Sequence, residues 1–127
     1  MRQELGIPAP ENNKEDLDWY QLAAEKGHPQ AQFMLGSMHE QGQGFQRNYK
    51  EAVKWWRLAA EQGDVYAQNF LAYSYWNGRG VLKDNVYAYM WYNISAYGGL
   101  EEAGEARDII VNQMTPSQIA EAQKLCS

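Results

Sequence analysis

The sequence predicts an all-α protein: an alpha-alpha superhelix, or solenoid, of about three 36-residue helix-turn-helix repeats with a C-terminal capping helix. Three observations predict it. The chain is similar to itself at an offset of 36 residues, its apolar residues recur with the period of an α-helix, and glycine-containing turns separate the apolar segments. Self-similarity at a period of about 20 to 50 residues is typical of stacked repeats.

The internal repeat is clearest where tryptophan begins a segment and glycine ends it. WYQLAAEKG (19–27), WWRLAAEQG (55–63) and WYNISAYGG (91–99) align at this offset. Residues 19–54 and 55–90 are identical at 12 of 36 positions, where unrelated stretches of ordinary composition share roughly two. Because the small alanines let neighbouring helices approach closely, we expect Trp19, Trp55 and Trp91 to fill the space beside them. Trp55 and Trp91 are expected to be packing residues rather than ligand-binding ones.

Each repeat has the pattern of two helices. In the second copy, Ala52, Trp55, Trp56, Ala59 and Ala60 lie at positions i, i+3, i+4, i+7 and i+8, which form the apolar stripe of an amphipathic helix. Together with the turn residues, this periodicity predicts seven helices. They span residues 13–26, 29–41, 49–62, 65–77, 85–97, 101–113 and 116–125.

Capping residues mark where these helices begin and end. Asn48 with a glutamate three residues later forms a capping-box pattern, and Asp64 can cap the next helix. Gly63 can adopt the left-handed conformation that ends a helix. Thr115 begins a Thr-x-x-Gln start for the last helix, whose polar face can end the stack in water. We expect residues 1–11 to form a poorly ordered lead and residues 12–127 to form a single domain.

Composition restricts the class of partner. With 127 residues and 45% apolar content, the chain can close one core. Its formal net charge of −5 argues against nucleic acid, which requires clustered Lys and Arg. No apolar run is close to the length of a membrane span, which is about 20 residues. The N-terminus lacks the apolar core of a signal peptide. We therefore expect a cytoplasmic protein. The alternative is a periplasmic or secreted mature form whose targeting segment has been removed.

The sequence contains no pattern typical of an enzyme. His39 and Glu40 are adjacent and so lie on different faces of a helix, and no HExxH or Cys/His spacing supplies metal ligands. The paired glycines of the turns lack the spacing of a phosphate-binding loop. The single cysteine, Cys126, cannot form an internal disulfide. We expect no catalytic residues, no cofactor and no metal.

The chain resembles the Sel-one-like repeats, a family related to the tetratricopeptide repeats. The resemblance rests on residues 31–64 and 67–99, which carry AxxxLG, GxG, Asp/Asn-x3-A and W-x3-AA-x2-G elements in order. Ala72 stands where the family has the glycine that Gly36 retains, and Ser95 replaces an alanine. The resemblance implies a stack of helix pairs in which the first helix of each pair lines the concave side. The cysteine pairs of the family's secreted branch are absent, so that branch's proposed hydrolytic activity is not expected.

The resemblance also implies a non-enzymatic protein-interaction module or adaptor. We expect a peptide or a partner protein to bind on the concave face, through an apolar and aromatic groove flanked by amides. Two alternatives are a homodimerising structural unit and a cell-envelope factor that recognises peptidoglycan or its enzymes. Whether Tyr73 and Trp76 belong to the groove or to the core stays open. The groove residues predicted from helix position are Met34, Ser37, Gln41, Tyr66, Asn69, Phe70, Tyr73, Trp76, Asn77, Ile109 and Asn112.

Overall fold

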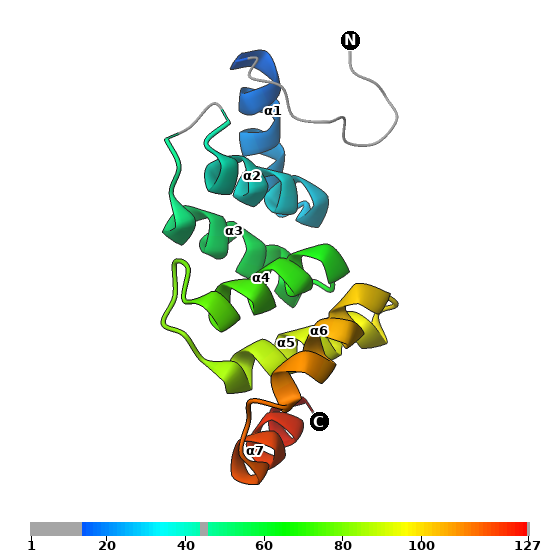
Figure 1. Ribbon diagram of the computed structural model, residues 1–127. Coiled ribbons are helices and arrows are strands. Elements are labelled where there is room, and N and C mark those ends of the chain that lie inside the picture. The colour runs from blue at the N-terminus through cyan, green and yellow to red at the C-terminus, as the bar shows by residue number, and fades with distance from the viewer. Residues whose placement is uncertain (1–13, 44–45, 127) are drawn as a thin grey trace.

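The computed structural model describes residues 14–43 and 46–126, and within them the chain is entirely helical (Figure 1). The seven predicted helices are confirmed, each boundary lying within two residues of its predicted place. The expected lead at residues 1–11 lies outside the described residues. The helices are α1 (Lys14–Glu25), α2 (Pro29–Gln41), α3 (Tyr49–Glu61), α4 (Val65–Asn77), α5 (Asn85–Tyr97), α6 (Glu101–Val111) and α7 (Pro116–Cys126).

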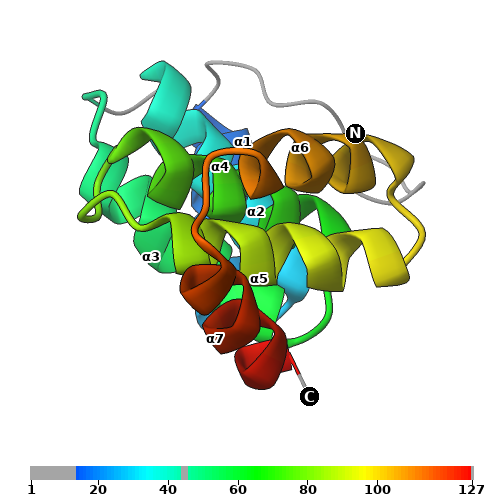
Figure 2. The same cartoon turned by 60° about the horizontal axis from the view of Figure 1, so that its bottom comes forward.

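The helices stack one upon another along the molecule, from α1 at the top of Figure 1 to α7 at the bottom. Each helix from α1 to α5 packs against the next one in sequence, whereas α7 packs against α5. Figure 2 shows α7 beside α5, with α6 on the other side of α5. The predicted solenoid of helix pairs with a terminal capping helix is therefore confirmed.

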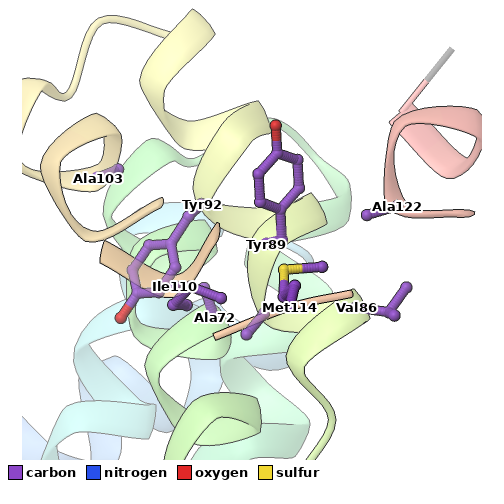
Figure 3. Close-up of a cluster of buried hydrophobic side chains, with 9 residues drawn as sticks. Ala72, Val86, Tyr89, Tyr92, Ala103, Ile110, Met114 and Ala122 are labelled. Carbon is purple, nitrogen blue, oxygen red and sulfur yellow. The ribbon is translucent and has the colours of Figure 1, made fainter. Parts of the chain in front are cut away.

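The core is divided into three clusters that follow the stack. The first joins α1, α2 and α3 around Tyr20 and Leu35, and the second joins α3 and α4 around Trp56 and Leu71. The third gathers side chains from α4 to α7 (Figure 3). Leu71, which the repeat register places at the centre of the stack, has no exposed surface. Each helix pair thus buries its apolar side against its neighbours, as expected for a repeat protein.

The leading tryptophans differ according to their place in the stack. Trp55 is 7% exposed, because it covers the cluster formed by α1 and α2. Trp91 is half-buried between the second and third clusters. The expectation that Trp19 is also a packing residue is wrong, since this side chain is 49% exposed. Its ring contacts Tyr20 edge-on at 5.1 Å and lies on the outer side of the first cluster.

The predicted caps are confirmed. The side chain of Asn48 accepts a hydrogen bond from the backbone N–H of Glu51, and Asp64 caps α4 in the same way. Thr115 and Gln118 exchange reciprocal side-chain to backbone hydrogen bonds at the start of α7, which is a complete capping box. Gly63 has a φ of 102°, the left-handed conformation expected after a helix.

Candidate functional site

Helix α4 carries apolar side chains on both of its sides. On one side Ala67, Leu71 and Ala72 are buried in the core. On the other side Tyr66 is 54% exposed and Tyr73, two helical turns later, is 46% exposed. A surface helix normally pairs one apolar stripe with a polar opposite face. Tyr66 and Tyr73 are therefore not needed to close the core. We call the surface that these two side chains form the α4 face.

The aromatic side chain of Phe33 in α2 extends the α4 face. Phe33 lies 6.1 Å from Tyr66 and 5.1 Å from Phe70, measured between ring centroids. Phe70 also contacts Trp56 edge-on at 5.2 Å, so it is half-buried and rests on the second cluster. The sequence prediction omitted Phe33, although this residue stands one repeat before Asn69, which was included.

The C-terminal end of α4 contacts α5 and the segment after α6. The indole of Trp76 packs edge-on against Tyr92 at 6.2 Å, and its Nε1 donates a hydrogen bond of 3.4 Å to Gln113. Trp76 is half-buried against the third cluster, so it is largely a core contact, whereas Tyr73 faces solvent. Asn77 is exposed, and its side-chain amide donates to the backbone carbonyl of Tyr73.

None of the predicted groove residues is fully buried, but they differ in exposure. Met34 packs against the first cluster, just as Phe70 and Trp76 pack against the others, and these three therefore serve the core as well. The exposed ones are Gln41, Tyr66, Tyr73, Asn77, Ile109 and Asn112, and the half-buried ones are Met34, Ser37, Asn69, Phe70 and Trp76.

Two arginines border the α4 face: Arg79 in the turn between α4 and α5, and Arg47 in the segment before α3. The guanidinium carbon of Arg79 lies 5.8 Å from the ring centroid of Tyr73 and 5.2 Å from that of Tyr49. Arg47 lies 6.0 Å from the ring centroid of Tyr49. We call these four residues the arginine–tyrosine patch. Sequence reasoning missed the patch because Tyr49 and Arg79 belong to different repeats.

Two titratable side chains and one surface hollow stand out in the part of the chain that the structure describes. Burial lowers the pKa of His39, with a smaller opposing effect from Glu51. Burial also raises the pKa of the Tyr92 phenol, and Tyr73 adds to this shift. Within residues 14–43 and 46–126, no cluster of three or more His, Cys, Asp or Glu side chains could hold a metal ion. A surface hollow of about 460 Å³ lies between the start of α5 and α7, where Lys83 and Glu121 line it.

The profile of the Sel1 repeat matches residues 3–28, 29–64 and 65–100, which correspond to α1, to the pair α2 and α3, and to the pair α4 and α5. The chain belongs to the Sel1 repeat family. No curated protein matches the chain at a significant level. The first matched repeat begins at residue 3, before the expected domain start at residue 12.

Two solved structures share this architecture. The first is a protective antigen present in uropathogenic Escherichia coli strains, which displays an SLR fold, with 35% identity and a TM-score of 0.86 over 89% of this chain. The second is a Sel1 repeat protein from Oxalobacter formigenes, with 37% identity and a TM-score of 0.76 over 79% of this chain. The chain spans 24% of the first protein's length and 41% of the second's. No helix in the described part is long and apolar enough to cross a membrane.

Proposed function

We propose that this Sel1 repeat chain is a non-catalytic interaction module that binds a peptide or a partner protein on its α4 face. Sel1 repeats are in general protein-interaction modules. The observation that carries the proposal for this chain is the outward position of Tyr66 and Tyr73 on a helix whose other side already completes the core. Tyrosine is enriched where proteins meet, because it combines a large apolar ring with a hydrogen-bonding hydroxyl.

The arrangement of the α4 face suits a peptide in an extended or helical conformation. Phe33 and Phe70 form an apolar floor that the core supports, and Tyr66 stands beside it. The exposed amides of Gln41 and Asn77 lie about two turns further along the same helices and can hydrogen-bond to a peptide backbone. Rigid aromatic anchors with adaptable polar neighbours are typical of surfaces that bind peptide side chains in pockets.

A second candidate function is self-association, which the outer side of α1 favours. Trp19 is 49% exposed and Leu22 is 54% exposed, one helical turn apart. The repeat equivalent of Trp19 is Trp55, which is buried against the preceding helix pair. A second copy of the chain could cover Trp19 of α1 as α1 and α2 cover Trp55 of α3. In that case, Trp19→Ala would convert a concentration-dependent dimer into a monomer in sedimentation experiments.

The proposal is tested with a double variant that changes exposed residues only. Tyr66→Ala/Tyr73→Ala removes the outward rings and leaves the half-buried Trp76 in place. The matched control is Tyr87→Ala/Tyr97→Ala, which removes two exposed tyrosines from α5. Affinity capture from the source organism, with circular dichroism to verify folding, should recover a partner with wild type and control but not with the α4 variant. Equal recovery by all three proteins would refute the α4 face as the binding site.

A further inference from the structure

We propose that the segment bound on the α4 face carries an acidic side chain, whose carboxylate binds between Arg79 and Arg47 of the arginine–tyrosine patch. This inference rests on the proposed function, because it assigns the chemistry of the partner at the same surface. Its predicted ligand is a peptide that places an aspartate or a glutamate next to the apolar residue held by Tyr66 and Tyr73.

The patch is continuous with the α4 face. Tyr73 belongs to both, since its outward ring contacts the guanidinium of Arg79 at 5.8 Å. Arg79 in turn lies 5.2 Å from the ring of Tyr49, and Arg47 reaches the same ring at 6.0 Å. A peptide whose apolar side chain rests against Tyr73 therefore has Arg79 immediately beside it, and Arg47 lies at the next ring, Tyr49.

Neither arginine has an acidic partner within the described part of the chain. The carboxylate of Glu51 lies 3.7 Å from Lys54, and Arg107 is paired with its neighbour Asp108 at 3.2 Å. The side chains of Arg47 and Arg79, in contrast, contact tyrosine rings, and both residues are exposed. Cations held near one ring repel each other, and an anion between them would be attracted by both.

The turn that carries Arg79 is fixed against α3. Gly80 has a φ of 76°, and a Cβ atom there would lie 2.5 Å from the backbone oxygen of Tyr49 and 3.0 Å from Cγ2 of Val53. The backbone therefore crosses the first turn of α3 at a distance that only glycine allows. This contact holds Arg79 over Tyr49 before any ligand arrives, which reduces the entropy lost on binding.

The net charge of the chain is opposite in sign to that of the patch. The chain has a formal net charge of −5, so an acidic peptide is repelled by most of the molecule. Guanidinium groups pair with carboxylates through two parallel hydrogen bonds, which adds geometric selectivity to the charge. The patch thus favours acidic ligands only when they lie along the α4 face.

The test selects short random-sequence peptides on the immobilised wild-type protein and measures their binding by fluorescence anisotropy. We expect the selected peptides to combine an aromatic or aliphatic residue with a nearby Asp or Glu. Arg47→Gln/Arg79→Gln should weaken their binding by about 10-fold or more, with a smaller loss at high salt. Lys26→Gln, which removes an exposed charge from the distant α1 turn, should leave binding unchanged.

A double-mutant cycle identifies the contact. Replacing the peptide's acidic residue by its amide should cost as much as the double arginine substitution, and the two changes together should cost little more than either alone. Peptides without acidic residues that bind wild type and the arginine variant equally, but fail to bind Tyr66→Ala/Tyr73→Ala, would overturn this inference and leave the proposed function standing. If no selected peptide depends on the two tyrosines, the proposed function fails and the inference fails with it.

Discussion

Replacing Gly36 by alanine should destabilise the protein, although alanine is the better helix former. A Cβ atom at Gly36 would lie 2.7 Å from both Cδ1 and Nε1 of Trp56 and 3.0 Å from the backbone oxygen of Ala52. The indole cannot easily move away, because it is 4% exposed and its Nε1 donates to the backbone oxygen of Phe33 at 3.3 Å. Overpacking of this kind costs about 1 to 3 kcal/mol.

Alanine also stabilises a helix interior by about 0.5 to 1 kcal/mol relative to glycine, which offsets part of that cost. We therefore expect Gly36→Ala to lower the free energy of unfolding by up to about 2.5 kcal/mol. The matched control is Gly104→Ala in α6, where the nearest atoms to a new Cβ lie at 3.5 and 3.6 Å, an ordinary contact distance. Because both sites are inside helices, the propensity gain is the same, and the control should become more stable.

Urea unfolding followed by circular dichroism measures both variants against wild type. The difference between them should be about 1 to 3 kcal/mol, which is the cost of the contact with Trp56 alone. If Gly36→Ala is as stable as Gly104→Ala, the indole does not occupy this space and the packing argument fails. The corresponding pair in the next repeat is Ala72 and Tyr92, which are both buried in the third cluster.

The remaining predictions concern the core and its response to pH. Leu71→Ala should lower the free energy of unfolding by about 2 to 5 kcal/mol in urea, since the side chain is fully buried, and a loss below about half a kcal/mol would contradict the register. Ser95→Ala should cost about 1 kcal/mol in thermal unfolding, because its hydroxyl donates to the Val65 oxygen at 2.7 Å, and the exposed Ser117→Ala serves as a control. Burial places the folded-state pKa of His39 below its ordinary value of 6.5, so the unfolded chain binds more protons between the two values. Stability should therefore fall as pH drops below 6.5, and His39→Gln should reduce this fall; an equal slope in both proteins would refute it.

The fold was predictable from sequence because its signals are local and repeated. Glycine and Asx residues mark the helix ends, and the caps at Asn48 and Asp64 form as expected. Burial of Leu71 follows from the register of the repeat. The exposure of Trp19 did not follow, because the repeat gives it the position of Trp55, which is buried against residues of α1 and α2.

The candidate site was predictable in part. Helix position correctly selected exposed residues such as Tyr66 and Tyr73, since period 3.6 alone decides which side of α4 they occupy. It did not separate them from Trp76, which lies on the same helix but contacts Tyr92. Trp76 reaches the core because Tyr92 of α5 lies against it, and this contact is between residues of different helices.

The arginine–tyrosine patch could not be predicted from single repeats, because its residues come from two of them. Tyr49 begins α3, whereas Tyr73 and Arg79 belong to the next repeat, and the approach of Gly80 to the start of α3 brings them together. Because none of these side chains is buried, changes there should alter binding with little effect on unfolding. The outward side of a repeat and the turn beside it can therefore vary together to suit a partner, while the inward side keeps the stack intact.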